Sequence, residues 1–543
     1  MKLILTETNN SIREKIQELS DKITNSDKYP FFHLTNEIEL KALFGLLYYR
    51  ALLGLSKVKS SRLFEKKLGH PIFGATMHRN RFTFLLGQLR FDDKASRKQR
   101  WRADRFAAIR ELFEIFNENC NSSLSPTEYL ALDETLYAFR GRIGIKQYNP
   151  KKPAKYGPLF QSINAVIFAY TYSICVVAGK PVDGSGQFYT PTVLSKVQRL
   201  VENLEQHVSL KGRNLTTDRY YTSIGLAKWL LEKNITLIGT FRANRQGIPP
   251  QIKTLSEREE FSYQVLWEKG SQDMSLHSYV VKTKSSGPKN ILVLATRDVP
   301  KVGITKDYRK KKPAIINAYN FTNGGVDIQD QRMGNYSTSS KSKKFTRKVL
   351  SYLLDTARVN AQTIYYLIML LSPRKSNSFD FLLSLAEEMV RPHIESRPLK
   401  GLKDDEIRKM SFVLDRPINK KAATASLESV PQLPDQNVST RARRKAKRQL
   451  GPSAPIPTSS KALASEVVKF ESTGKKRRCS DCLESIKGPG HKKAKDKLIQ
   501  YKWQCCSCSK ALCKKHSNII CDQCPKSFVK RNQEEEDRQA MQD

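Results

Sequence analysis

A change of hydrophobic pattern at Pro126 limits this chain to folds that combine helices with a sheet. Before Pro126, the stretches 37–55 and 102–120 place apolar residues at helical spacing. After it, three short β-rich runs follow one another, TEYLALD, INAVIFAY and SICVVAG. Helical and strand patterns then alternate as far as ITLIGTF at 235–241, in the order β-β-β-α-β-α-β. This order predicts an α/β fold with a mixed sheet covered by helices.

The stretch from Tyr156 to Gly179 has no charged residue over 24 positions, long enough to cross a bilayer. Its interior holds Gln161 and Asn164, and YTYS is typical of a turn between two β-rich runs. We therefore expect two adjacent buried strands here and no membrane span. The first residues, MKLIL, have an apolar run too short for a secretory signal, so no export signal is expected.

The rest of the chain divides by composition. Residues 246–311 are charged and β-leaning, which fits an insertion into the α/β core, and 346–371 has a long helical pattern. Residues 412–475 are rich in Ser, Pro, Ala, Lys and Arg and cannot form a packed core. The expected segments are 1–125 (helical), 126–245 (first part of the core), 246–311 (insertion), 312–336 (last part of the core), 337–411 (helical), 412–475 (linker), 476–526 (cysteine-rich) and 527–543 (charged tail).

The charge of the chain indicates a polyanionic partner. It has 94 Lys plus Arg against 53 Asp plus Glu, a formal net charge of +41. Such an excess repels itself unless a polyanion is bound, and nucleic acid is the first candidate. A ribosomal-type or lipid-surface protein is the alternative, but 39% hydrophobic content in patterned segments favours globular domains. The basic runs RARRKAKR (441–448) and KKRR (475–478) resemble nuclear import signals, which predicts a nuclear protein.

Several aspartates stand at the end of an apolar strand or the start of a helix. Asp133 ends LALD, Asp218 ends NLTTD, and Asp327 and Asp330 follow NGGV, three residues apart. In the last segment, the two glycines are expected to form a strand-to-helix turn. Strand ends at one edge of a sheet can bring distant carboxylates together, and these repel unless a cation lies between them.

Hard oxygen ligands of this kind suit Mg²⁺ or Mn²⁺. Two such ions are a known device for phosphodiester cleavage and strand transfer. The alternative is that each Asp forms a turn or caps a helix, which is the more common role of a single Asp.

Longer motifs resemble the blocks of the piggyBac-type transposases. They are DETLYAFRGR, QYNPKKPAKYG, TTDRYYTSIGLAKWLLEKNITLIGTFRANR and YNFTNGGVDIQDQ, with MHRNRFTFLLGQLRFDD upstream. The resemblance implies an RNase H-like catalytic core with a β-rich insertion, flanked by an α-helical dimerisation and DNA-binding domain. It also implies a homodimer, insertion at TTAA sites, and Asp133, Asp218 and Asp327 as the catalytic magnesium ligands, with Asp330 as an accessory.

Two departures from the family pattern stand out. Pro158, Leu159 and Phe160 follow KYG where the family has an Ile-Lys type step, which removes a basic residue. Arg219 stands where a small polar Asn commonly follows the second Asp. This arginine either competes for the carboxylate or binds the scissile phosphate, and the sequence leaves both alternatives open.

Two clusters of cations are candidates for contacts with double-stranded DNA. The first has six cations within sixteen residues, with Tyr148 and Tyr156 interleaved, and the second lies between the third Asp and a helix. Such contacts position the duplex without reading its sequence; the alternative is a pair of solvated loops. The expected DNA-binding residues are Arg140, Arg142, Lys151, Lys152, Lys155, Lys341, Lys343, Lys344, Arg347 and Lys348.

The C-terminal region has the spacing of a zinc domain. Eight of the ten cysteines lie between Cys479 and Cys524, and seven of them form, together with His516, four consecutive pairs spaced by two residues. The eight ligands suffice for two tetrahedral Zn²⁺ sites, and the metal would supply the folding energy that so small a core lacks. In the cross-brace zinc domain of this family, the first ligand pair shares one zinc ion with the third pair, and the second pair shares the other with the fourth. Cys506 is then spare or replaces Cys505. The ligands are Cys479, Cys482, Cys505, Cys508, Cys513, His516, Cys521 and Cys524.

These features lead to a cut-and-paste DNA transposase as the first hypothesis. It would bind terminal inverted repeats, cleave DNA by two-metal hydrolysis and join the 3′-OH ends to TTAA sites. The second hypothesis is a domesticated, catalytically silent DNA-binding protein that keeps the fold. A third, a RING-like ubiquitin ligase built on the zinc pairs, fits the lysine-rich loops less well than DNA does.

Overall fold

The computed structural model describes residues 1–20, 31–65, 67, 69–182, 192–245, 248–249, 252, 258–270, 273–283, 287–296, 312–369, 377–418, 472–478 and 500–503. The chain divides into two compact units, residues 1–367 with 376–428 and residues 368–375 with 429–543. The second unit contains an antiparallel pair, β11 (Ser472–Arg478) with β12 (Gln500–Trp503). The first unit holds the sheet and the helices around it.

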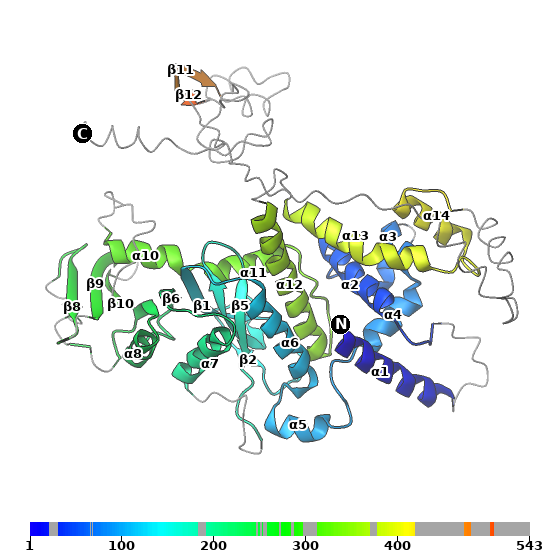
Figure 1. Cartoon of the computed structure of the whole chain (residues 1–543), viewed down its shortest axis with the longest axis horizontal. Coiled ribbons are helices and arrows are strands. Elements are labelled where there is room, and N and C mark those ends of the chain that lie inside the picture. The colour runs from blue at the N-terminus through cyan, green and yellow to red at the C-terminus, as the bar shows by residue number, and fades with distance from the viewer. Residues whose placement is uncertain are drawn as a thin grey trace, which may run out of the picture. The chain divides into compact units, whose positions relative to one another are not determined.

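An eight-stranded mixed sheet forms the centre of the first unit (Figure 1), in the order β5-β4-β1-β6-β7-β10-β9-β8. The neighbours β1, β6 and β7 run parallel, and every other pair in this sheet is antiparallel. The predicted α/β class with a mixed sheet is confirmed. The strands are β1 (Tyr129–Leu136), β4 (Leu159–Ala165), β5 (Thr171–Val176), β6 (Asn214–Thr217), β7 (Thr236–Phe241), β8 (Tyr263–Trp267), β9 (Met274–Thr283) and β10 (Gly287–Thr296).

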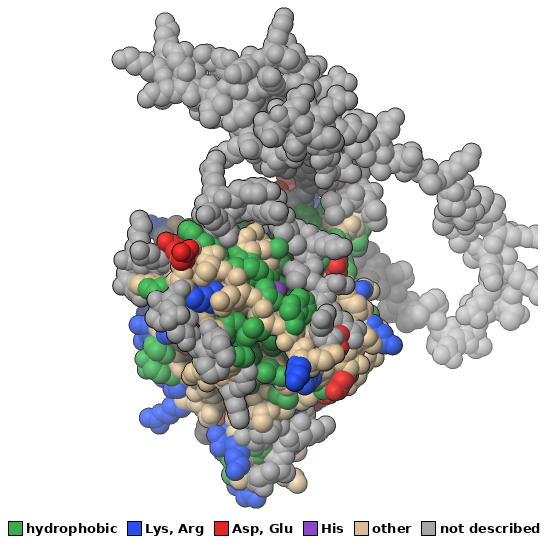
Figure 2. Space-filling model, turned by 90° about the vertical axis from the view of Figure 1, so that its left-hand side faces the viewer, with side chains coloured by type: hydrophobic (Ala, Val, Ile, Leu, Met, Phe, Trp, Pro, Cys, Tyr) green, Lys and Arg blue, Asp and Glu red, His purple; other side chains and the backbone are tan. Residues whose placement is uncertain are grey.

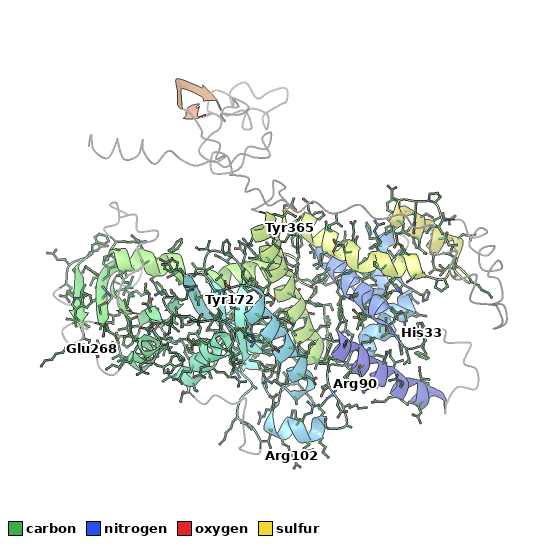
Figure 3. The ribbon with its side chains drawn as sticks, viewed as in Figure 1. His33, Arg90, Arg102, Tyr172, Glu268 and Tyr365 are labelled. Atoms are coloured by element: carbon green, nitrogen blue, oxygen red, sulfur yellow. The ribbon has the colours of Figure 1, made fainter. Side chains whose placement is uncertain are left out.

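The long uncharged stretch forms β4 and β5, which pair antiparallel, so the expectation of two strands is confirmed. Both strands are almost wholly buried, which explains their lack of charge. Tyr172 lies among these strands (Figure 3), and its hydroxyl donates to Ser125 O at 3.2 Å. Within the described part of the chain, no helix has the length and apolar character that crossing a membrane requires.

The charged segment 246–311 supplies β8, β9 and β10, which extend the main sheet beyond β7 through the antiparallel β7–β10 pair. Side chains of this region line a recess of about 220 Å³ whose walls are mostly apolar, among them Phe241, Trp267 and Leu294. Figure 2 shows apolar side chains gathered on this end of the molecule.

Alternation along the strands divides the core between two helical layers. Leu130 and Leu132 on β1 point to one face, where they join the core cluster of α7 (Val193–Glu205) and α8 (Ile224–Glu232). The residues between them point to the opposite face, because successive side chains on a strand alternate. That opposite face is covered by α6 (Ala107–Ser123), α10 (Ala314–Thr322), α11 (Gly325–Asn335) and α12 (Phe345–Met369).

Aromatic stacking attaches α6 and α12 to the sheet. The ring of Phe160 on β4 stacks on Tyr352 of α12 with centroids 4.0 Å apart, and on Phe113 of α6 at 6.0 Å. All three side chains are buried. Of the three residues in the Pro158-Leu159-Phe160 departure, Phe160 therefore supplies core packing, and Leu159, where the Lys of the family's Ile-Lys step would stand, is half-buried.

Further helices pack beside this α/β core. Segments far apart in the sequence meet here: α13 packs along α2 and α14 against α3, so residues 378–414 join the N-terminal helices. A buried ion pair braces them, with Arg81 Nη2 2.6 Å from Glu39 Oε2. The helices are α1 (Lys2–Ser20), α2 (Glu37–Leu52), the 3-10 helix η2 (Ser60–Phe64), α3 (Pro71–Thr76), α4 (Arg79–Gln88), α5 (Arg97–Ala103), α13 (Ser378–Ser396) and α14 (Asp404–Leu414).

The expected strand-to-helix turn at the two glycines is wrong. Helix α10 precedes them, so Asn323 and Gly324 form a connection between two helices. The segment AIINAYNFT is rich in β-favouring residues, but Ile315, Ile316 and Ala318 are buried together in the core cluster against β7 and β10. Tertiary packing therefore overrides the local strand propensity.

Candidate active site

The first two aspartates lie side by side, just beyond the last residues of the parallel β1–β6 pair. The expected strand end is wrong for Asp133, because β1 continues to Leu136 and stays paired with β4. In the parallel β1–β6 pair Leu132 is opposite Thr217, so Asp133 and Asp218 occupy the next position along. Neighbouring strands are about 4.8 Å apart. Asp133 shares its face with Ala131, and Asp218 with Thr216, whose hydroxyl donates to Thr322 of α10 at 2.8 Å. Both carboxylates therefore belong to the face that α10 and α11 cover.

Helix α11 brings the other two aspartates close to this position. Asp327 is exposed in the first turn of α11, and Asp330 is half-buried one turn further. Asp330 Oδ1 accepts a hydrogen bond from Thr135 Oγ1 on β1 at 2.7 Å. Gly325 permits this approach, because a Cβ there would lie 2.7 Å from Ala165 O. The sequence therefore correctly predicted that Gly325 lies at the start of a helix. The reason that a glycine is needed there is the close packing against Ala165, and not a turn.

The electrostatics show that these carboxylates influence one another. Burial raises the pKa of Asp133 to about 7, and the charge of Glu134 and a hydrogen bond with it add to the effect. Burial also raises the pKa of Asp218, with a further contribution from the negative charge of Asp133. Asp330 has a pKa of about 6, raised by burial and by the charges of Asp327 and Asp133. The mutual repulsion means that the group would be stabilised by a cation.

The electrostatics of Tyr319 on α10 also show that Asp133 and Asp218 lie close to the same helix. Burial raises the pKa of its phenol, and the negative charges of Asp218 and Asp133 raise it further. Both carboxylates therefore face α10 from neighbouring strands. Asp218 is oriented by its own turn, since Tyr220 N donates to its Oδ1 at 2.8 Å.

Glu134 is fixed by a set of contacts that the sequence did not reveal. Its Oε2 accepts from the Tyr221 hydroxyl at 2.9 Å, and that hydroxyl accepts from Gln161 Nε2 at 2.9 Å. Lys152 Nζ lies 3.8 Å from Glu134 Oε1 and donates to the Glu134 carbonyl at 2.7 Å. These partners come from three separate segments, and no spacing motif connects them. Glu134 is thus fixed by these partners while it also contacts Asp133.

The donor set fits a hard divalent cation. It consists only of carboxylate oxygens, on half-buried or exposed residues. In the described residues, no three His, Cys, Asp or Glu side chains are grouped closely enough to hold a metal ion by themselves. Mg²⁺ commonly binds through one or two carboxylates and completes its shell with waters and substrate phosphates, so it does not need a closed cage.

The first predicted DNA-binding cluster surrounds a small hairpin between β1 and β4. Its strands are β2 (Gln147–Tyr148) and β3 (Tyr156–Gly157). Lys152 is tied to Glu134 and so has a structural contact inside the protein. Four predicted DNA-binding cations are exposed on this segment, at Arg140, Arg142, Lys151 and Lys155.

The second predicted cluster lies at the start of α12. Lys341 and Lys343 are exposed. Lys344 Nζ donates to Gly87 O at 2.6 Å, and Lys348 Nζ donates to Ser339 Oγ at 2.7 Å. The half-buried Arg347 has its pKa lowered by burial. The cluster therefore divides into exposed cations and cations that also hold the local structure.

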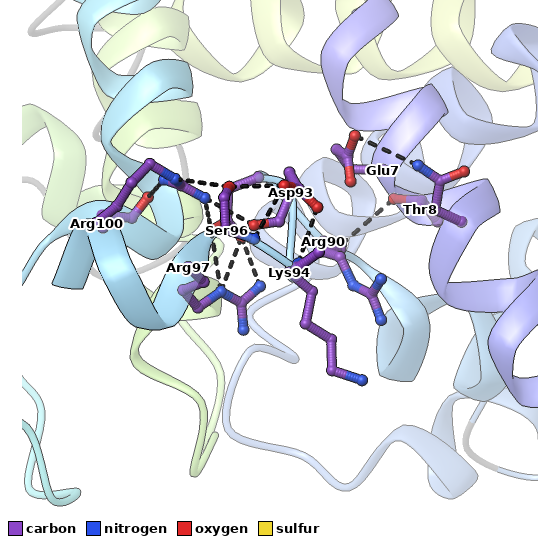
Figure 4. A network of polar contacts seen from close by, with 12 residues as sticks. Glu7, Thr8, Arg90, Asp93, Lys94, Ser96, Arg97 and Arg100 are labelled. Carbon is purple, nitrogen blue, oxygen red and sulfur yellow. Dashed lines mark hydrogen bonds and ion pairs between the residues drawn. The ribbon is translucent and has the colours of Figure 1, made fainter.

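Arg90 and Arg97, from the N-terminal part of the chain, lie near the second predicted cluster. Burial and the positive charges of Arg347, Arg90 and Arg97 lower the pKa of Lys344, so these four residues lie near one another. Figure 4 shows the polar network around Arg90 and Arg97. Arg97 Nη2 is 2.5 Å from the carboxylate of the buried Asp92. Arg90 is also labelled in Figure 3. The sequence analysis had not assigned Arg90 or Arg97 to the basic surface.

Arg219 is exposed, so it does not close over the Asp218 carboxylate from within the protein. Two further arginines flank the site and were missed by the sequence analysis. The charge of Arg242 lowers the pKa of Asp218, and Arg245 Nη2 donates to Tyr220 O at 3.0 Å. Both arginines directly follow β7, which runs parallel to β6. Their position after a strand pattern could therefore have predicted that they lie near Asp218, which follows β6.

The predicted zinc ligands all lie outside the described residues. They are Cys479, Cys482, Cys505, Cys508, Cys513, His516, Cys521 and Cys524.

Comparisons with known proteins identify a family, several relatives and a similar solved structure. The family described as "Transposase IS4" matches residues 1–362. Human PiggyBac transposable element-derived protein 3 is 24% identical over 335 residues, which is 60% of this chain and 55% of that protein. Human PiggyBac transposable element-derived protein 2 is 23% identical over 345 residues, again 60% and 55%. The chain thus spans about half the length of these relatives.

A solved structure is similar over almost the whole chain. It is the cryo-EM structure of the piggyBac transposase synaptic complex with hairpin DNA. The TM-score is 0.66 at 25% identity, and the alignment covers 96% of this chain and 94% of that chain.

Proposed function

Because the chain belongs to the Transposase IS4 family and its resemblance to the piggyBac-type transposases is confirmed, we propose that it is a cut-and-paste DNA transposase. The strands β5-β4-β1-β6-β7 are its RNase H-like catalytic core. Asp133, Asp218 and Asp327 hold two Mg²⁺ or Mn²⁺ ions, with Asp330 as an accessory. The observation that carries this proposal is the convergence of Asp133, Asp218 and Asp330 beside exposed Asp327.

Two divalent cations bound there would activate the attacking oxygen and stabilise the leaving oxygen. The protein's own residues orient the carboxylates. Thr135 holds Asp330 and the Tyr220 amide holds Asp218, so both present defined oxygen atoms. Burial on the covered face of the sheet strengthens every charge interaction at the site.

The basic surfaces position double-stranded DNA for this reaction. Exposed Lys341 and Lys343 and the cations of the β2–β3 hairpin contact phosphates, which gives affinity without sequence readout. The family resemblance further supports binding to terminal inverted repeats, joining of 3′-OH ends to TTAA sites, a homodimer and a nuclear location. By the same resemblance, the C-terminal cysteine pairs bind two Zn²⁺ ions and recognise the repeat ends.

The direct test is Asp133→Asn, which keeps the size of the side chain and removes its charge. We expect it to bind DNA ending in the terminal repeat and to lose Mg²⁺-dependent cleavage. Asp415→Asn is the matched control, because Asp415 is exposed at the end of α14 in a left-handed conformation that Asn also adopts (φ 50°). Cleavage retained by Asp133→Asn would refute the assignment.

A domesticated DNA-binding protein that no longer cuts is the second candidate. The names of the human relatives describe proteins derived from transposable elements. Under this alternative, the unsubstituted chain would bind DNA and show no cleavage in Mg²⁺ or Mn²⁺. The same assay therefore separates the two functions.

A further inference from the structure

The β2–β3 hairpin presents two stacked tyrosine rings to solvent. Tyr148 and Tyr156 pair across the hairpin, with centroids 4.6 Å apart and planes inclined by 28°. The two residues are 59% and 38% exposed. Cross-strand aromatic pairs stabilise hairpins through mutual packing. Such packing accounts for the stack but leaves two large ring surfaces in water.

The surroundings of these rings favour an anion. Lys146 Nζ lies 6.0 Å from the centroid of the Tyr156 ring. No acidic residue occurs between residues 135 and 182, and exposed lysines and arginines flank both hairpin strands. Flat rings amid cations match a ligand that combines planar π surfaces with negative charge, and nucleic acid has both.

The hairpin is attached firmly to the strand that carries Asp133. Beyond β1, Tyr137 N donates to Pro158 O at 3.1 Å and Phe139 N donates to Tyr156 O at 2.9 Å. Gly157 allows this contact, because a Cβ there would lie 1.8 Å from Tyr137 O. Tyr156 is thus opposite Phe139, six residues along from Asp133. At about 3.3 Å per residue this is about 20 Å, the length of about six stacked nucleotides.

Building on the proposed function, we propose that Tyr148 and Tyr156 form a stacking platform for an unpaired base near the cleaved end of the DNA. Inside a duplex each base is already stacked on both faces, so only an unpaired or terminal base can offer its ring. Stacking on tyrosine tolerates any base, and the neighbouring cations hold the phosphates. Tyr148 and Tyr156 are positioning residues, since they lie away from the carboxylates.

The test uses the full chain without divalent cations, so that the DNA stays uncut. The probes are a fully paired duplex and a forked duplex with 2-aminopurine at each of the first six unpaired positions. We expect the unsubstituted chain to quench the fluorescence at one or two of these positions. Replacing both tyrosines with Leu should relieve the quenching and reduce the preference for the forked DNA by about 5- to 100-fold. The Tyr→Phe pair keeps the rings and should behave as the unsubstituted chain.

Trp267→Leu is the matched control, because this side chain is a 57% exposed aromatic on the outer strand β8. It should change neither the quenching nor the preference. Quenching that survives the double Leu change, or equal affinity for both probes, would overturn the platform and leave the transposase proposal standing. An unsubstituted chain that binds neither probe would overturn both. Loss of quenching in the Phe pair would also contradict stacking as the mechanism.

Discussion

Gly325→Ala tests whether the third acidic segment is positioned by close packing of α11 against the sheet. The new Cβ would lie 2.7 Å from Ala165 O and 3.1 Å from Ala131 Cβ, and ordinary contact begins at 3.4 Å. The helix must therefore move by about 0.7 Å, the difference between 3.4 and 2.7 Å. Overpacking of this kind costs about 1–3 kcal/mol of unfolding free energy.

The displacement should also affect catalysis, because Asp327 and Asp330 move with the helix. A shift near 1 Å at a catalytic site can cost about 100-fold in rate, so we expect a loss of about 10- to 100-fold in Mg²⁺-dependent cleavage. Urea unfolding measures the stability, and cleavage of a terminal-repeat substrate measures the rate. The two readouts are independent, so a defect in stability alone is distinguishable from misplaced carboxylates.

Gly334→Ala on the same helix is the matched control. A Cβ at Gly334 meets no atom within 4 Å, and alanine favours the helix by about 0.5–1 kcal/mol. This variant should be as stable as the unsubstituted chain or more so. If Gly325→Ala unfolded at the same urea concentration as Gly334→Ala, the close contact with β1 and β4 would not be what fixes α11.

Three further predictions concern the rest of the chain. Arg81→Met should cost about 3–5 kcal/mol in urea unfolding, because it leaves the buried Glu39 carboxylate without its cation; adding Glu39→Gln should restore part of the loss. Burial raises the pKa of Asp355 to about 6 from its ordinary 3.8, so the folded state binds the extra proton between these values. Its contribution to the free energy of unfolding is therefore complete below pH 3.8 and is lost as the pH rises to about 6, a loss of roughly 3 kcal/mol in total. In urea titrations, Asp355→Asn should lack this dependence of the unfolding free energy on pH. Lys341→Gln and Lys343→Gln should each reduce the slope of log K against log salt for duplex DNA by about 0.9 if each lysine contacts one phosphate, and an unchanged slope would remove that lysine from the interface.

The sequence was most informative where local pattern and sheet geometry agree. The apolar runs before Asp133 and Asp218 predicted two strands, and the parallel β1–β6 pair places these two residues side by side, although β1 continues beyond Asp133 to Leu136. The two glycines predicted a helix start, and Asp327 does stand in the first turn of α11. These inferences depend on short-range periodicity, which a single sequence contains.

Other features depend on contacts between distant segments. The segment before the two glycines was expected to be a strand, and only the packing of α10 on β7 and β10 decides otherwise. The bond from Lys152 to Glu134 gives a predicted DNA-binding residue a contact inside the protein. The network of Tyr221 and Gln161 likewise joins residues 60 positions apart. No composition or spacing signal encodes such pairings.

The way α12 covers the sheet determines which shortened versions of this protein can exist. Tyr352 stacks on β4, the Asp355 carboxylate accepts from the Tyr137 hydroxyl at 3.0 Å, and Thr363 Oγ1 donates to Ala169 O at 2.9 Å. A polypeptide that stopped after α11 would contain every proposed magnesium ligand, yet it would expose the apolar surface around Phe160. Such a truncation should aggregate during refolding, and biochemistry on the carboxylates requires a chain that continues at least through residue 369.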